Sequence, residues 1–374
     1  MNVHERGRDP SLKNHIDVDI IDCDVHPVIR GGVKGLLPYV PEAWRRRFEL
    51  KLGHLAAAAP LTMRYEHPSG SAIRTDASPS EGAPGGSDPD FVIKDLIEGH
   101  GINCAVLNSL QAGQFAVALA GPDESIVLCS AANDYFIEEW GLISTGPLRL
   151  AMSVPTQDPD AAAAEIRRLA PNGAVACISL PLLNILMGNR WYYPIYEAAQ
   201  EQGLSILVHL TGAESIYKGA PASAAGWTEN YPERYVSLAQ IGQANLTSLM
   251  FSGTFEKFPD LKFLFVEYGF TWILSHIWRM DKTWQSMRYD VPWVKKPPGE
   301  YIHERVRFST QPLDEPEDPK QLYTMIDMIG DDVLMYSSDY PHWDNDMPGQ
   351  SLIGLSKESK RRIFRENALA ALRL

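Results

Sequence analysis

The chain has 374 residues, of which 45% are hydrophobic and 22% are charged, a composition typical of globular proteins. Its formal net charge of −13 argues against a nucleic-acid partner, because an acidic surface does not displace the counterions of a phosphate backbone. No apolar run is long enough to cross a bilayer, and segment 1–15 lacks the apolar core of a signal peptide. We therefore predict a cytoplasmic protein that acts on a small molecule and binds neither nucleic acid nor a membrane.

Eight short apolar segments recur along the chain, rich in β-branched residues and followed closely by turn-forming or polar residues. This pattern is typical of buried strands that end in turns. The predicted strands span residues 18–26, 102–110, 148–156, 174–182, 204–212, 261–269, 305–312 and 332–340.

Segments of helical periodicity separate these strands, with typical start and stop residues. Gly203 ends the segment 193–203 as a C-cap, and Ser356 begins the last segment as an N-cap. Strands that alternate with helices predict an α/β fold with a parallel sheet, and eight strands close a (β/α)8 TIM barrel. A doubly wound open sheet is the alternative, but no Gly-x-Gly-x-x-Gly motif follows the first strand.

Two connections are longer than a simple barrel needs. They span residues 28–88, which are rich in Gly, Pro and Ser toward their end, and residues 213–235. Long connections in compact domains are usually functional lids or disordered segments. We expect both to be lid insertions, after strands 1 and 5, in a single domain that spans residues 1–374.

The first strand carries three ionisable side chains. In the segment Ile-Asp-Cys-Asp-Val-His, the period of two places Asp22, Asp24 and His26 on one face. Such groups are costly to bury unless they are paired or coordinate a metal ion. The spacing alone fits a hydrogen-bonded polar cluster and a metal site equally well.

Two further strands end in side chains that can bind metal. His209 interrupts the apolar fifth strand, and Asp339 ends the eighth in the segment Ser-Ser-Asp-Tyr-Pro-His-Trp-Asp. A lone histidine in an apolar strand is more often a core residue than a ligand. In a barrel, however, the carboxyl ends of strands 1, 5 and 8 meet at one rim, where active sites are built. The combination therefore favours metal coordination.

These strand ends resemble the amidohydrolase superfamily, and more narrowly its amidohydrolase-related branch, which includes aminocarboxymuconate semialdehyde decarboxylase and the resorcylate decarboxylases. The order of elements is similar over residues 18–374. The resemblance implies that Asp24, His26, His209 and Asp339 bind the metal, with Asp24 in place of the first histidine of the superfamily's Asp-x-His-x-His motif. It also implies that Asp339 accepts a proton.

One divalent ion is expected, because no lysine ends the fourth strand, where binuclear relatives carry a bridging lysine. Two histidines and two carboxylates suit Zn²⁺ with a position left for water, and oxygen-rich sites also accept Mn²⁺.

Three weaker candidates surround this set. His342, three residues after Asp339, is predicted to serve as an acid or base or to contact the substrate, since histidine titrates near neutral pH. Gln311 and Trp343 are predicted to contact the substrate. A solvated amide for Gln311, and a turn in which His342 stacks on Trp343, are the structural alternatives.

Glu267 departs from the resembling decarboxylases, which carry a histidine at the end of strand six. A glutamate is ionised at neutral pH and so does not readily deliver a proton to carbon. We therefore expect a catalytic role for Glu267 in hydrolysis of an amide, a lactone or an activated C–C bond of a small aromatic or carboxylated substrate. Non-oxidative decarboxylation of a hydroxybenzoate-like or enol acid is the alternative, followed by an inactive binding barrel. We also expect a homodimer or homotetramer.

Overall fold

We analysed a computed structural model of the chain. The residues that it describes are 18–58, 72–80, 83–119, 121–211, 219–221, 228–350 and 352–374.

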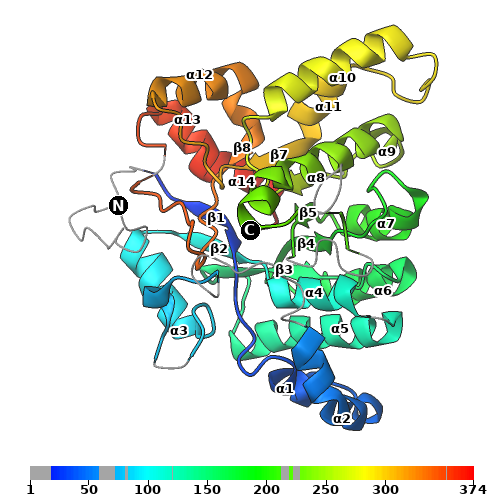
Figure 1. The fold of residues 1–374 in the computed structure, drawn as a ribbon, viewed down its shortest axis with the longest axis vertical. Helices are drawn as coiled ribbons and strands as arrows, with labels where there is room; N and C mark the ends of the chain where they lie inside the picture. Colours follow the sequence, from blue (N-terminus) through cyan, green and yellow to red (C-terminus); the bar gives the residue numbers. More distant parts are fainter. Residues whose placement is uncertain are drawn as a thin grey trace.

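The strands form one parallel sheet in which every strand pairs with the next along the chain. Figure 1 shows these strands at the centre of the molecule with helices around them. The predicted (β/α)8 barrel is confirmed. The strands are β1 (Ile21–Val25), β2 (Cys104–Leu107), β3 (Leu148–Ser153), β4 (Val175–Pro181), β5 (Ile206–His209), β6 (Phe263–Phe265), β7 (Val306–Ser309) and β8 (Leu334–Met335).

The seam between the last strand and the first is joined by backbone hydrogen bonds beyond the two residues of β8. Cys23 N donates to Tyr336 O at 3.1 Å, and His26 N donates to Tyr340 O at 2.7 Å. Asp339 N donates to the carbonyl of Asp24 at 3.2 Å. The segment that carries Asp339 is therefore held against the segment that carries Asp24 and His26.

Capping residues mark the ends of several helices, and these include the two that the sequence predicts. The side chain of Asp158 accepts a hydrogen bond from Ala161 N at the start of α6, and Ser356 caps α13 in the same way. Gly203, after α7, has a φ of 64°, which suits its predicted C-cap role. The helices are α1 (Val33–Leu36), α2 (Glu42–Ala58), α3 (Pro89–Val92), α4 (Leu110–Ala118), α5 (Pro122–Glu139), α6 (Pro159–Leu169), α7 (Tyr193–Glu201), α8 (Tyr231–Phe251), α9 (Thr254–Lys257), α10 (Ile273–Met287), α11 (Pro298–Arg305), α12 (Pro319–Ile329), α13 (Lys357–Arg361) and α14 (Asn367–Ala371).

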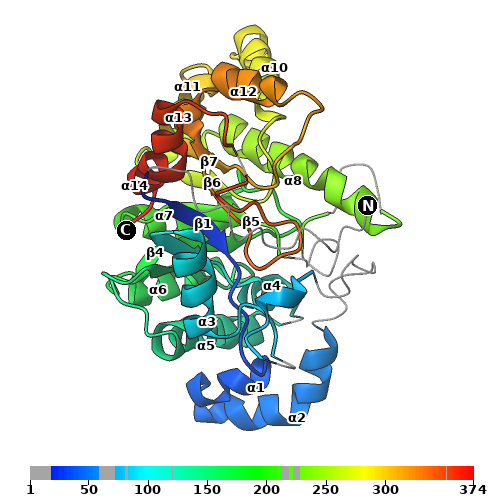
Figure 2. The same ribbon diagram turned by 90° about the vertical axis from the view of Figure 1, so that its left-hand side faces the viewer.

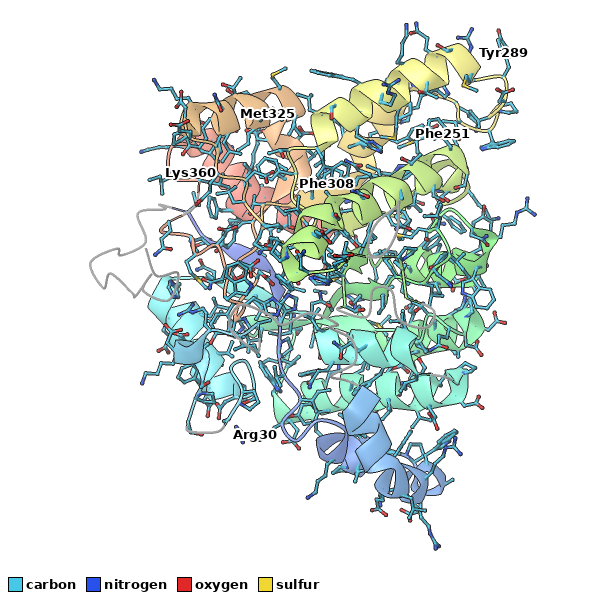
Figure 3. All side chains as sticks on the ribbon, viewed as in Figure 1. Arg30, Phe251, Tyr289, Phe308, Met325 and Lys360 are labelled. Atoms are coloured by element: carbon cyan, nitrogen blue, oxygen red, sulfur yellow. The ribbon has the colours of Figure 1, made fainter. Side chains whose placement is uncertain are left out.

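Two groups of helices lie at opposite ends of the longest axis. Figures 1 and 2 show α1 and α2 at one end and α10 with α12 at the other. Figure 3 places Tyr289 at the tip beyond α10, where it is 82% exposed, and Phe308 in the interior, where it is fully buried. Among the described residues, no helix is both long and apolar enough to span a membrane.

The barrel interior is filled by side chains. A hydrophobic cluster joins residues of non-neighbouring strands, which can meet only inside the barrel, and it includes Val106, Cys177, Leu207 and Met335. Ala371 of α14 belongs to the same cluster. Because successive residues of a strand face opposite sides, Leu207 places His209 on the inner face of β5.

Candidate metal centre

The four residues that the sequence predicts as metal ligands lie together in the structure. Asp24, His26, His209 and Asp339 are all buried. His209 Nε2 lies 3.0 Å from Asp24 Oδ2, and His26 Nε2 lies 3.2 Å from the same oxygen. His26 Nε2 is also 2.8 Å from Asp339 Oδ1. The ends of β1, β5 and β8 therefore converge as a barrel requires.

The two inner imidazoles are oriented by backbone carbonyls. His26 Nδ1 lies 2.8 Å from Asn108 O, and His209 Nδ1 contacts Leu210 O. An Nδ1–H that donates to a carbonyl leaves the lone pair of Nε2 for a metal ion. His26 Nε2 is buried without a hydrogen-bond partner among the described residues, although two carboxylate oxygens lie within 3.2 Å. A cation between these atoms would satisfy all of them.

Opposite charges dominate the electrostatics of the cluster. Burial by itself would raise the pKa of Asp24 and of Asp339, but the neighbouring imidazoles outweigh it and hold both pKa values below their ordinary range. Burial would lower the pKa of His209, but Asp24 and Glu267 outweigh it and raise this pKa to about 10. Burial would also lower the pKa of His26, but Asp24 and Asp339 outweigh it and raise this pKa. The carboxylates thus require positive charge beside them, which protons or a divalent cation can supply.

The donor atoms that could hold a metal ion form two groups that share His26. Within the described chain, two overlapping groups each bring three ligand atoms to within 4.8 Å of one another. The first consists of Asp24, His26 and His209, and the second of His26, Asp339 and His342. Imidazole nitrogens mixed with carboxylate oxygens suit zinc or manganese.

Glu267 and His342 lie on the outer side of the cluster. Glu267 Oε2 is 3.1 Å from His209 Nε2, and His342 Nδ1 is 2.7 Å from Asp339 Oδ1. Their side chains are 14% and 13% exposed, more than any of the four predicted ligands. The ring of His342 stacks on that of His26 at a centroid distance of 4.6 Å. These two groups are therefore placed to meet a substrate, and their catalytic roles stay predictions.

Backbone strain accompanies two of these residues. Glu267 has a φ of 65° and Asp339 a φ of 61°, a region that residues other than glycine rarely adopt. Such strain persists only where the surroundings enforce it, and it clusters at functional sites. Here Ser309 Oγ accepts the backbone N–H of Glu267 at 3.0 Å.

Gln311 lies inside the cluster, and Trp343 lies beside it. Gln311 is fully buried, which rules out the solvated amide, and its Nε2 donates to Asp339 Oδ2 at 3.0 Å. The ring of Trp343 lies 6.3 Å from that of Tyr235 in α8. Their contacts with substrate stay predictions.

Part of the first predicted lid lies against the loop after β8. Ile73 forms an antiparallel bridge with His342, and Arg74 N donates to Pro341 O at 2.9 Å. Residues 59–71 and 81–82 of this insertion, and residues 213–218 and 222–227 of the second, lie outside the described residues.

A family model described as "Amidohydrolase" matches residues 21–374 of the chain. The chain belongs to the amidohydrolase family.

Solved structures of similar fold include decarboxylases. One is 5-carboxyvanillate decarboxylase from Novosphingobium aromaticivorans with manganese and 4-hydroxy-3-methoxy-5-nitrobenzoic acid, at 19% identity, 97% coverage of this chain, 99% of that chain and a TM-score of 0.67. Another is 2,6-dihydroxybenzoate decarboxylase from Rhizobium, at 17% identity, 94% and 98% coverage and a TM-score of 0.63. A third is dihydroxybenzoic acid decarboxylase from Polaromonas with manganese and 2-nitroresorcinol, at 17% identity, 94% and 96% coverage and a TM-score of 0.62. The family match confirms the predicted resemblance to amidohydrolases, and these structures, at 17–19% identity, show a shared fold.

Other residues around the cluster of this amidohydrolase were not predicted. Asn108 Nδ2 donates to Asp24 Oδ1 at 3.1 Å, and Ser179 Oγ donates to Asn108 Oδ1 at 2.8 Å. In the sequence, their position near the ends of predicted strands is what could have indicated that Asn108 and Ser179 lie beside the metal ligands. Asp22, which the sequence places on the same face as Asp24 and His26, accepts the backbone N–H of Ser338 and of Asp24, and burial raises its pKa to about 7.

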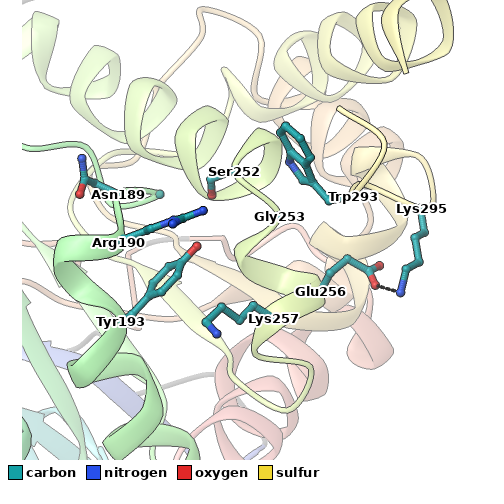
Figure 4. Close-up of a pocket in the computed structure, with 10 residues that line it drawn as sticks. Asn189, Arg190, Tyr193, Ser252, Gly253, Glu256, Lys257, Trp293 and Lys295 are labelled. Atoms are coloured by element: carbon teal, nitrogen blue, oxygen red, sulfur yellow. Dashed lines mark ion pairs between the residues drawn. The ribbon is translucent and has the colours of Figure 1, made fainter. Parts of the chain in front are cut away.

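A cavity of about 780 Å³ lies elsewhere on this amidohydrolase, at α7, α9 and the chain after α10. Figure 4 shows its lining, in which Lys295 pairs with Glu256 at 2.7 Å. None of the clustered ligands lines this cavity. The metal-binding side chains, and not the volume of this cavity, therefore indicate where the candidate site lies.

Proposed function

We propose that this amidohydrolase is a divalent-metal-dependent, non-oxidative decarboxylase of a hydroxybenzoate-like acid. The observation that carries the proposal is the buried cluster of Asp24, His26, His209 and Asp339 on a fold shared along almost the whole chain with decarboxylases of aromatic acids. Decarboxylation, which the sequence analysis gives as the alternative, is thus favoured over hydrolysis.

We propose Mn²⁺ as the ion in place of Zn²⁺. Two of the similar structures contain manganese, and the mixed oxygen and nitrogen donors of this cluster accept it. Held by the four ligands, the ion would supply positive charge that attracts the carboxylate and phenol oxygens of a substrate.

The protein's own part in the reaction is proton delivery. His342 Nδ1 and Asp339 Oδ1 are 2.7 Å apart, close enough to share a proton. The pair would give that proton to the ring carbon that bears the carboxylate. The C–C bond then breaks, its electrons restore the aromatic ring, and CO₂ leaves, so that the substrate carboxylate and one proton become a phenol and CO₂.

Hydrolysis remains a second candidate because of Glu267. A carboxylate stands at the end of β6 beside the cluster, and with Asp339 it would orient a water and take its proton. Such an arrangement suits cleavage of an amide, a lactone or an activated C–C bond.

The experiment incubates the Mn²⁺-loaded enzyme with a panel of hydroxybenzoates in D₂O and in H₂¹⁸O. We expect CO₂ release and one solvent deuterium on the ring carbon, with no label from water oxygen in the phenol. Asp339→Asn, which preserves the shape of the side chain, gives the uncatalysed background. For the hydrolytic candidate, amides, lactones and ring-cleavage products are tested in the same way. A product with ¹⁸O in a new carboxylate and no CO₂ would replace decarboxylation with hydrolysis.

We also propose a homodimer or homotetramer, to be tested by sedimentation velocity on the full chain. A single species at the monomer mass of 41.7 kDa would exclude both.

A further inference from the structure

A chain of hydrogen bonds leads from α8 to a predicted metal ligand. Tyr235, on the second turn of α8, donates its hydroxyl to Asp344 Oδ2. Gln311 Nε2 lies 3.5 Å from the same oxygen and donates to Asp339 Oδ2 at 3.0 Å. The order of the contacts is therefore Tyr235, Asp344, Gln311 and Asp339.

The hydrogen bond from Gln311 matters for Asp339 because the other carboxylate oxygen of Asp339, Oδ1, is shared by two histidines. Asp339 Oδ1 lies 2.8 Å from His26 Nε2 and 2.7 Å from His342 Nδ1. The bond from Gln311 to Oδ2 fixes the rotation of the carboxylate about its last torsion. This rotation decides which lone pairs face His26.

Gln311 in turn has two orientations that differ only in which end of the amide faces Asp339. With the nitrogen toward Asp339 the contact is a hydrogen bond, and with the oxygen toward Asp339 it is repulsive. Asp344 accepts from the same nitrogen and so favours the first orientation. Because Gln311 is fully buried, water does not readily replace a lost partner.

We propose that Tyr235 and Asp344 are positioning residues that hold the Gln311 amide and, through it, the Asp339 carboxylate in the orientation that binds the metal ion. This inference rests on the proposed metal centre. It also couples metal affinity to the placement of α8, whose first turns belong to the second predicted insertion.

The test measures Mn²⁺ affinity by isothermal titration calorimetry on the full, chelator-stripped chain, with no substrate present. Partners of metal ligands typically contribute about 10- to 100-fold to affinity, so Asp344→Ala is expected to weaken Mn²⁺ binding within that range. Asp344→Asn keeps an acceptor oxygen for Tyr235 and Gln311 and is expected to remain within about threefold of the parent, since the acceptor and not the charge is needed. Tyr235→Phe removes one oxygen atom and is expected to weaken binding by about three- to tenfold.

Tyr231→Phe is the matched control. Tyr231 lies one turn before Tyr235 on α8 and stacks on it at a centroid distance of 5.8 Å. Its variant is expected to keep the parent affinity. Thermal unfolding of each metal-free variant shows whether the barrel is intact, and Tyr235→Phe serves as the test if Asp344→Ala does not fold.

Three results would overturn the inference. Asp344→Ala and Tyr235→Phe could bind Mn²⁺ as the parent does, Tyr231→Phe could weaken binding as much as Tyr235→Phe, or the parent could bind no Mn²⁺. The third result also removes the metal-dependent function. Failure to release CO₂ from any substrate would count against the proposed reaction alone, because the titration involves no substrate.

Discussion

Histidine–aspartate contacts occur in two very different regions of the molecule. On the outer surface, His303 Nδ1 lies 2.9 Å from Asp332 Oδ2, and the two side chains are 43% and 46% exposed. At the barrel mouth, His26 and His209 contact Asp24 at similar distances, but these side chains are at most 4% exposed. The same two kinds of group thus meet at similar distances in water and in the interior.

The difference lies in how many groups share each contact. The surface pair is one imidazole with one carboxylate, which a single proton satisfies. At the barrel mouth, three imidazoles share two aspartates, and Glu267 also contacts His209. Buried charges are costly unless they are paired or coordinate a metal. The deep cluster is therefore suited to holding a cation, whereas the surface pair is a weak ion pair.

Loss of one deep ligand should have the largest effect. In His209→Ala we expect Mn²⁺ affinity to fall by at least about 100-fold, because even the partners of metal ligands contribute about 10- to 100-fold. Activity should be lost with the metal, while most of the barrel stays folded. Elemental analysis after dialysis, with circular dichroism for the fold, tests this. If the variant holds as much metal as the parent, His209 is a core residue and not a metal ligand.

Replacement of the more exposed acid should separate chemistry from metal binding. For the hydrolytic candidate, in which Glu267 would take a proton from water, we expect Glu267→Gln to lower turnover by about 100-fold, the lower end of what a positioned acid or base contributes. Its Mn²⁺ affinity should change by less than about tenfold, because the amide keeps the size of the side chain. Turnover is measured by steady-state kinetics on a substrate identified with the panel described above, and Mn²⁺ affinity is measured by calorimetry. Metal loss as severe as in His209→Ala would place Glu267 among the ligands.

Removal of the ion should destabilise the deep cluster and leave the surface pair unaffected. A ligand that binds only the folded state contributes about 2.7 kcal/mol when its concentration is 100 times Kd. Urea unfolding with Mn²⁺ and with a chelator should therefore differ by about this amount, and His209→Ala should show little difference. Equal stabilisation of the parent and His209→Ala by Mn²⁺ would indicate a binding site elsewhere.

The sequence predicted the deep cluster because its members obey rules that are local or set by the fold. The period of two places Asp24 and His26 on one face, and a barrel brings strand ends to one rim. Strand lengths were overestimated: the predicted segment 332–340 contains only the two-residue β8. After Met335 the chain bends to carry Asp339, and it meets β1 through separate hydrogen bonds at Tyr336 and Tyr340 in place of a regular ladder.

The partners of the ligands could not be predicted in this way. Asn108 meets Asp24 across 84 positions of the sequence, and Tyr235 meets Asp344 across 109. No local period brings such pairs together. Their contact depends on the path of loops and on where α8 begins, which only the packed structure shows.

The smallest effect is expected at the surface pair, and it depends on pH in a defined direction. The hydrogen bond to Asp332 outweighs partial burial and raises the pKa of His303 above its ordinary value. A raised pKa in the folded state contributes stability below the unfolded pKa, near 6.5, and this contribution is lost as pH rises through the folded pKa. Because water and salt screen both side chains, the coupling should be about 0.5 kcal/mol or less.

A double-mutant cycle measures this coupling. His303→Ala, Asp332→Ala and the double variant are compared by urea unfolding at pH 5.5 and pH 9. We expect a small coupling at pH 5.5, where Asp332 is ionised because His303 outweighs burial and lowers its pKa, and none at pH 9. A coupling of several kcal/mol, or one that grows as pH rises, would mean that exposure does not weaken a histidine–aspartate contact in this protein. The contrast between the surface pair and the deep cluster would then have to rest on the number of shared groups alone.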